Sequence, residues 1–100
     1  MESCPNCQKN KKQPRDEEMV KKLKIRINKV TGQLNGVNRM IDENRYCVDI
    51  LTQISAIESA LKEIGYIILE DHLKSCVSDD IKNDDFSSLE EAIAICKKLV

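Results

Sequence analysis

Two cysteines and a histidine in the middle of the chain could together bind a soft metal ion. Cys47, His72 and Cys76 offer thiol and imidazole groups, and His72 is the only histidine in the sequence. Thiolate and imidazole ligands favour Cu(I), zinc or iron–sulfur clusters, whereas nickel and cobalt recruit more nitrogen and oxygen donors. A structural zinc site needs four ligands. Three ligands without an obvious fourth therefore fit trigonal Cu(I) better.

The three residues are expected on one side of a long helix from Tyr46 to Cys76. No proline interrupts this segment, and its apolar residues recur in steps of three and four, which keeps them on one helical face. The stripe consists of Cys47, Ile50, Ile54, Ile57, Leu61, Ile64 and Ile68. It continues in steps of four to His72 and Cys76, which as i, i+4 neighbours lie about 5–6 Å apart at Cβ.

Cys47 is too far from the other two residues to join them within one chain. It precedes His72 by 25 residues, which is about 37 Å at a helical rise of about 1.5 Å per residue. Either Cys47 is only a core residue, or a second subunit completes the site. Two antiparallel helices related by a two-fold axis would bring Cys47 of one chain to His72 and Cys76 of the other, twice per dimer. The alternative for each residue alone is an inert core cysteine or a surface histidine.

A first helix is expected from near Asp16, which can cap it, to about Glu43. Gly32 and Gly36 lie inside it, and each costs about 1 kcal/mol relative to alanine. They indicate either a close approach of another backbone, from protein or nucleic acid, or simple helix packing. The apolar stripe of this helix consists of Val20, Leu23, Ile27, Val30, Leu34, Val37 and Ile41.

Two short connections complete the predicted fold. Asn44 and Arg45 form a turn, and so short a connection makes the first two helices antiparallel. An acidic loop is expected at Asp79-Asp80 and Asn83-Asp84-Asp85. Ser87 and Glu90 then form a capping box at the start of a third helix. One face of this helix carries Leu89, Ile93, Cys96 and Val100, so Cys96 is interpreted as a packing residue.

Composition predicts an all-α protein with one domain at residues 16–100 and a flexible arm at residues 1–15. The 100 residues are 41% hydrophobic and 33% charged, with three glycines and two prolines, which excludes a disordered chain. Only three aromatics are present, and the long stripes need a partner, so we expect a homo-oligomer. No signal peptide or membrane-length apolar run is visible, which predicts a cytoplasmic protein without membrane contact.

The cysteines predict metal or thiol chemistry, because five cysteines in a reducing compartment do not form structural disulfides. Cys4 and Cys7 in the arm make half of a zinc site without a matching second pair. They are either an accessory metal or thiol site or an incidental feature of the tail. No nucleophile–base pair, phosphate loop or carboxylate pair stands out. We therefore expect a binding protein, with no small-molecule substrate, and not an enzyme.

Charge is distributed unevenly, although the net charge is only −1. Residues 1–45 carry eleven Lys and Arg against six Asp and Glu, or +5, and residues 46–100 carry five against eleven, or −6. No acidic residue occurs between Met19 and Ile41, where the cations are Lys21, Lys22, Lys24, Arg26, Lys29 and Arg39. Such a surface is typical of phosphate binding, and it predicts a nucleic-acid partner.

Several motifs resemble the copper-sensing CsoR repressors, a family that also includes nickel, formaldehyde and persulfide sensors. The similar segments are Arg45-Tyr46-Cys47-Val48-Asp49-Ile50-Leu51, Gln53-Ile54-Ser55-Ala56 and Leu69-Glu70-Asp71-His72, followed by Cys76. The resemblance covers roughly Leu23 to Val100. Its most specific part is the pattern of a cysteine followed by His-x3-Cys.

The resemblance implies a protomer of three helices, an antiparallel four-helix-bundle dimer, and a homotetramer built as a dimer of dimers. It also implies a repressor that binds double-stranded operator DNA in the apo form, without a helix-turn-helix. Cu(I) binding would release it and derepress copper-efflux genes. By position, Cys47, His72 and Cys76 would bind one Cu(I) per protomer, and each ion would bridge two subunits.

Further roles are carried over by position. Tyr46 and Glu91 match a tyrosine and a glutamate that the family places beside the ligands, where they could hydrogen-bond the far ring nitrogen of His72. The DNA-facing segment of the family's first helix matches Arg26, Lys29 and Gln33. Asn35 stands where many relatives carry a basic residue, so Lys22, Arg39 and Lys62 are expected to supply the missing charge.

Two alternative functions stay open. Persulfide sensors of the family lack the histidine, and its formaldehyde and nickel sensors lack the second cysteine, so the resemblance favours copper. A thiol-redox sensor could bridge Cys47 and Cys76 of two chains through sulfur species. A cytosolic copper buffer or chaperone, with Cys4 and Cys7 as a transfer arm, would never touch DNA. Strongly salt-dependent binding to duplex DNA would argue against the buffer.

Overall fold

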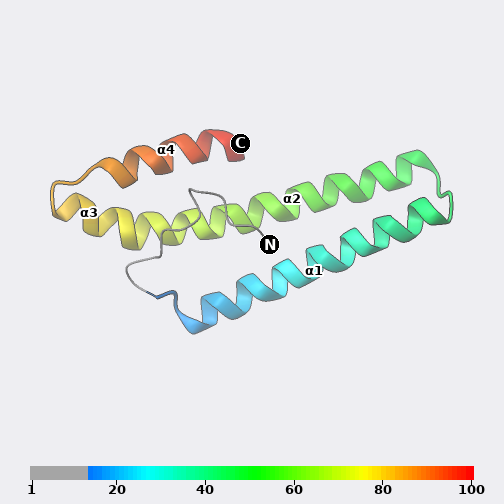
Figure 1. Cartoon of the computed structure of the whole chain (residues 1–100), viewed down its shortest axis with the longest axis horizontal. Coiled ribbons are helices and arrows are strands. Elements are labelled where there is room, and N and C mark those ends of the chain that lie inside the picture. Colours follow the sequence, from blue (N-terminus) through cyan, green and yellow to red (C-terminus); the bar gives the residue numbers. More distant parts are fainter. Residues whose placement is uncertain (1–13) are drawn as a thin grey trace.

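The computed structural model describes residues 14–100, which fold into helices without any strand. The elements are α1 (Glu17–Asp42), α2 (Cys47–His72), a π-helical turn (Leu73–Val77), α3 (Ser78–Lys82) and α4 (Ser87–Leu99). Figure 1 shows α1 and α2 as an antiparallel hairpin, with α4 folded back along the second half of α2. The predicted all-α class is confirmed. Cys4 and Cys7 lie outside the described residues.

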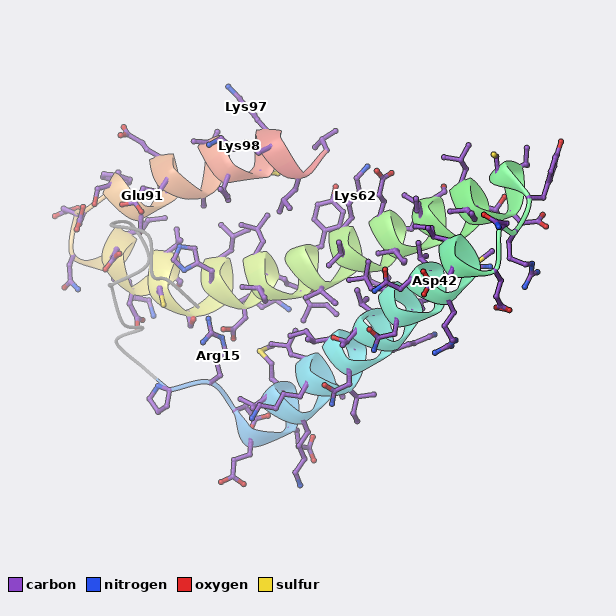
Figure 2. The ribbon with its side chains drawn as sticks, turned by 45° about the vertical axis from the view of Figure 1, so that its right-hand side comes forward. Arg15, Asp42, Lys62, Glu91, Lys97 and Lys98 are labelled. Atoms are coloured by element: carbon purple, nitrogen blue, oxygen red, sulfur yellow. The ribbon has the colours of Figure 1, made fainter. Side chains whose placement is uncertain are left out.

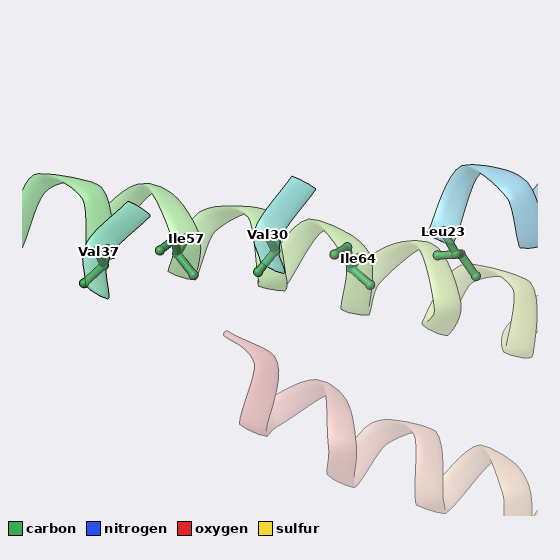
Figure 3. Packing of buried hydrophobic residues seen from close by; sticks show 5 residues of the cluster. All are labelled: Leu23, Val30, Val37, Ile57 and Ile64. Carbon is green, nitrogen blue, oxygen red and sulfur yellow. The ribbon is translucent and has the colours of Figure 1, made fainter. Parts of the chain in front are cut away.

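The hairpin is held together by a seam of residues spaced seven apart. Leu23, Val30 and Val37 of α1 are buried against Ile57 and Ile64 of α2, and Figure 3 shows these side chains meeting along the length of the two helices. A seven-residue spacing returns each side chain to nearly the same side of the helix. The seam therefore extends over about four turns of α1.

The turn between α1 and α2 is the one that the sequence predicts. Asn44 has a φ of 52°, a conformation that asparagine tolerates better than most residues. The backbone N–H of Asn44 donates to the oxygen of Ile41 at 3.1 Å, and that of Arg45 donates to the oxygen of Met40 at 2.9 Å. These bonds satisfy carbonyl groups at the end of α1.

The second helix extends further than predicted, since α2, the π turn and α3 form one continuous rod from Cys47 to Lys82. The prediction that Asp79-Asp80 belong to a loop is wrong, because both residues lie in α3. No glycine or proline stops the helix after Cys76, and Val77, only 2% exposed, anchors the segment in the interior. The chain leaves the helix at Asn83-Asp84, where Asp84 has a φ of 59°.

The capping box predicted for α4 does not form. Ser87 is the first residue of the helix and not its cap. The carboxylate of Asp85 accepts instead from the Ser87 backbone N–H at 3.0 Å and from its hydroxyl at 2.7 Å. At the other end of α4, Leu99 lies against Gly65 of α2, where an added Cβ would come within 3.0 Å of Leu99 Cδ2. Gly65 therefore permits the close approach of α4.

Half of each predicted apolar stripe is not covered by the hairpin. The alternate members on α1 and α2 are between 36% and 56% exposed, and they are Ile27, Leu34, Ile41, Ile54, Leu61 and Ile68. Each set has the same seven-residue spacing as the core seam and is offset from it by four residues along the chain. Because the helices are antiparallel, this offset turns both sets towards the same side of the hairpin. We call this surface the exposed stripe.

No helix in residues 14–100 is both long enough and apolar enough to cross a membrane.

Candidate metal centre and nucleic-acid surface

The three predicted metal ligands lie along one rod, and the structure does not bring them together within a chain. Cys47 is the first residue of α2 and is exposed, His72 is its last residue, and Cys76 lies in the π turn. His72 and Cys76 are both half-buried, and the cysteines are free thiols. Among residues 14–100, no group of three metal-binding side chains could hold an ion. One chain therefore supplies His72 and Cys76 as a pair, and Cys47 alone.

Cys47 lies in line with the exposed stripe. It precedes Ile54 by seven residues, and Ile54, Leu61 and Ile68 continue at the same spacing towards His72. Of the two alternatives that the sequence left open, a core position for Cys47 is not observed in the single chain, because its side chain faces solvent. A second copy packed on the exposed stripe would also cover Cys47.

A π-helical turn surrounds Cys76, which the sequence analysis did not foresee. The turn covers Leu73–Val77, and single π turns inside α-helices occur often at functional sites. On its outer side Lys74 pairs with Glu70 at 2.8 Å. The hydrogen bond from Lys74 and the charge of Glu70 raise the pKa of the lysine. The Lys74 ammonium group therefore forms an ion pair with a carboxylate one turn earlier in the same chain.

The two residues expected to support His72 lie near opposite ends of the rod, Tyr46 just before its start and Glu91 on α4 beside its second half. Tyr46 forms the N-cap of α2 and is 69% exposed. Glu91 lies on α4, which packs against the π turn (Figure 2). Tyr46 and His72 are 26 residues apart, or about 39 Å along a helix. Only Glu91 could reach the His72 of its own chain, so any contact of Tyr46 with a histidine would join two chains.

The predicted DNA-binding residues of α1 form a line on the side opposite the exposed stripe. Lys22, Arg26, Lys29 and Gln33 follow one another in steps of four, three and four, which places them on one side of the helix. A hollow of about 350 Å³ lies beside Lys22 and Arg26 and extends to Ile67 of α2. A second hollow of about 260 Å³ lies beside Gln33 and Arg39 and extends to Arg45 and Gln53. We call this side of the hairpin the basic groove.

Lys62 is not part of the basic groove. It projects from the side of α2 that faces away from α1 (Figure 2). Arg39 does reach the groove, where it lines the second hollow together with Gln33. The structure therefore groups Arg39 with the cations of α1 and separates Lys62 from them.

Arg26 has a partner in the hairpin that the sequence analysis missed. Its Nη1 lies 3.1 Å from Oε1 of Glu63 on α2, and both side chains are about half exposed. The sequence does contain a signal for this ion pair: Arg26 is 18 residues before Asn44, and Glu63 is 18 residues after Arg45. Residues equally distant from the turn of an antiparallel hairpin lie opposite each other.

The glycines of α1 do not mark packing within the chain. A Cβ at Gly32 would meet nothing within 4 Å, and one at Gly36 would touch only Arg39 Nη2 at 3.8 Å. Close packing against another helix of the same chain is therefore not observed at either glycine, and packing against a second subunit or nucleic acid stays a prediction. Gly36 lines the second hollow of the basic groove, and Gly32 faces open space.

Comparison with known proteins identifies the family. A model described as metal-sensitive transcriptional repressor matches residues 19–98. The chain belongs to this family. Metal-sensitive repressors regulate transcription and are not enzymes, in agreement with the absence of catalytic motifs from the sequence.

Two sequence relatives of this repressor are copper sensors by name. The copper-sensing transcriptional repressor CsoR of Bacillus subtilis is 42% identical over 74 residues, which cover 73% of each chain. The copper-sensing repressor RicR of Mycobacterium tuberculosis is 49% identical over 53 residues, or 53% of this chain and 55% of that one.

Solved structures of the family share the fold of this repressor. The Cu(I)-bound copper-sensing repressor CsoR of Geobacillus thermodenitrificans superimposes with a TM-score of 0.80 at 39% identity, covering 86% of this chain and 91% of that one. The nickel-responsive transcriptional regulator InrS superimposes with a TM-score of 0.70 at 27% identity and covers 88% of this chain. The predicted resemblance to the CsoR family is confirmed.

Proposed function

We propose that this repressor senses Cu(I): it binds operator DNA in the apo form and releases it when Cu(I) binds. The observation that carries the proposal is the placement of Cys47, His72 and Cys76 in one line with the exposed stripe. Two thiolates and one imidazole form a soft donor set that suits Cu(I). The named copper sensors among its relatives support the same ion. Operator DNA and its repressor share a compartment, so we place the protein in the cytoplasm.

We further propose that the metal site lies between two subunits. Two chains that pack antiparallel through their exposed stripes would form a four-helix bundle and bury Ile27, Leu34, Leu61 and their neighbours. The same packing would bring Cys47 of one chain to His72 and Cys76 of the other. Each dimer would then bind two Cu(I) ions, one per protomer. Two such dimers would form the tetramer, in which the basic grooves stay on the outer surface.

The arrangement explains how one ion could affect DNA binding. Cu(I) would fix the distance between the start of one rod and the end of its partner. The basic groove of each chain lies along α1, which packs against the rod of the same chain. A change in the angle between the two rods would therefore change which phosphates the cations can reach. Such coupling between two sites has a typical magnitude of about 1–3 kcal/mol, or 5- to 150-fold in affinity. DNA must weaken Cu(I) binding by the same factor.

Titration of Cu(I) into the DNA complex tests this function. The protein is bound to a labelled duplex from upstream of its own gene, without oxygen, and fluorescence anisotropy is followed as Cu(I) is added. We expect release that is complete near one Cu(I) per chain, with DNA affinity reduced by about 5- to 150-fold. Cys96→Ala should respond as the wild type, because Cys96 lies on α4 outside the proposed ligand set.

Other outcomes of this titration lead to other functions. Release by persulfide and not by Cu(I) would make the protein a thiol sensor of the same family. If Cu(I) binds but no duplex does, even at low salt, the copper buffer becomes the better interpretation.

Glu63 is expected to weaken DNA binding because its carboxylate forms an ion pair with the guanidinium group of Arg26. Glu63→Gln frees the guanidinium for phosphate, and exposed ion pairs of this kind contribute about 0.2–1 kcal/mol. We therefore expect DNA affinity to rise by about 1.4- to 5-fold for each engaged subunit. The slope of log K against log salt should steepen by about 0.9 for each Arg26 released.

Glu58→Gln is the matched control, since it removes the same charge from the same helix without contacting Arg26. In an Arg26→Ala background, Glu63→Gln should lose most of its effect. An equal gain in both backgrounds would show that Glu63 acts through general charge and not through Arg26.

A further inference from the structure

The hydroxyl group of Ser75 contacts the sulfur of Cys76. Its Oγ lies 3.7 Å from Cys76 Sγ and 2.8 Å from the backbone oxygen of Asp71. Both contacts are partly buried, so water competes less for the hydroxyl than it does on the surface. Neither the residue pattern nor the family comparison assigns a role to this serine.

The serine hydroxyl has one proton and two acceptors within reach. A hydroxyl donates one hydrogen bond at a time, so the proton points either to the Asp71 oxygen or to the Cys76 sulfur. A neutral thiol is a weak acceptor, and the Asp71 oxygen is closer. A metal-bound sulfur is a thiolate, and hydrogen bonds to ionised acceptors are roughly twice as strong as those between neutral groups. Metal binding therefore favours rotation of the proton towards sulfur.

The serine contacts an acceptor on each side of it in the chain. Ser75 and Cys76 both lie in the widened turn Leu73–Val77, and Asp71 precedes it by two residues. Through these two contacts, Ser75 links the sulfur of Cys76 to the backbone of Asp71, just before the π turn. Thr31 and Thr52 make the corresponding bond to the residue four earlier, at 3.0 and 2.8 Å. A threonine can therefore adopt the same geometry on the helices of this protein.

We propose that Ser75 is a positioning residue for Cys76, and that its hydroxyl donates to the cysteine sulfur when the sulfur binds Cu(I). This inference rests on the proposed function. The hydrogen bond orients the sulfur towards the incoming ion and compensates part of its negative charge. Groups that support metal ligands in this way contribute about 10- to 100-fold to metal affinity. Ser75 acts through Cys76 and does not touch the metal.

Two substitutions at position 75 test the proposal. Cu(I) affinity is measured by competition with a chromophoric Cu(I) chelator under anaerobic conditions. Ser75→Ala should bind Cu(I) about 10-fold more weakly than the wild type. Ser75→Thr keeps the hydroxyl and should restore the affinity to within about 3-fold. The ultraviolet band of thiolate bound to Cu(I) should shift in the alanine variant and not in the threonine variant.

Ser78→Ala provides the control, because it makes the same change in α3 of the same rod. Helicity and DNA affinity of the apo protein should be unchanged in all three variants, which separates positioning from loss of fold. The role of Ser75 is overturned if Ser75→Ala binds Cu(I) as tightly as the wild type. It is also overturned if Ser75→Ala loses Cu(I) affinity and Ser75→Thr loses it equally. A wild-type protein that binds no Cu(I) overturns the proposed function itself.

Discussion

A mixture of Cys47→Ala and His72→Ala chains is expected to recover Cu(I) binding that neither variant has alone. In a mixed dimer, the chain with an intact His72 and Cys76 faces the intact Cys47 of its partner, so one complete site forms. The other site of the same dimer lacks two ligands. After random re-association about half of the dimers are mixed, and the Cu(I) capacity should return to about a quarter of the wild-type value.

The measurement is Cu(I) stoichiometry after subunit exchange, for each variant alone and for the mixture. A mixture of His72→Ala and Cys76→Ala is the matched control, because these two ligands come from the same chain. Every mixed dimer then lacks one ligand in each site, and no capacity should return. If the first mixture forms dimers and still binds no Cu(I), the site does not bridge two subunits.

The second large effect is expected for Leu61→Glu, which should dissociate the dimer. Leu61 is halfway between Cys47 and Cys76, so in the antiparallel dimer it lies at the two-fold axis and faces its own copy. The substitution removes two leucines from the interface, at about 1.5–3 kcal/mol each, and places two like charges opposite each other. The dimer dissociation constant should rise at least about a hundredfold, since each 1.4 kcal/mol corresponds to a factor of ten.

Sedimentation equilibrium measures this change directly, and Cu(I) binding and DNA binding should be lost with the dimer. Ile95→Glu is the control, because Ile95 is 47% exposed on α4 and does not belong to the exposed stripe. A Leu61→Glu protein that stays dimeric and binds Cu(I) normally would place the subunit interface on another surface.

Most of the fold follows from local patterns in the sequence. The stripes with steps of three and four gave the two long helices, and Asn44-Arg45 gave the turn. The third helix was predicted one residue from its observed start, although Asp85 and not Ser87 provides the hydrogen bonds there. The loop at Asp79-Asp80 was wrong because acidic residues were interpreted as a break. Acidic residues do not by themselves end a helix: Asp79 and Asp80 are half-buried in α3, which directly follows the buried Val77.

The sequence by itself determined which residues share a helical side, because the 3.6-residue period fixes the direction of each side chain relative to its neighbours. It thereby placed Cys47, His72 and Cys76 in line, and Lys22, Arg26, Lys29 and Gln33 on a common side of α1. Only the tertiary structure decided which half of each stripe is buried in the hairpin, and it separated Lys62 from the basic groove.

The π turn around Cys76 and the contacts of Ser75 also required the tertiary structure. The π turn packs against α4, where Leu99 lies against Gly65 of α2, whereas both contacts of Ser75 are with residues close to it in the chain. A local period is encoded in a few successive residues. That period does not indicate where a helix widens into a π turn, nor which acceptor a serine hydroxyl contacts, so both had to be read from the structure.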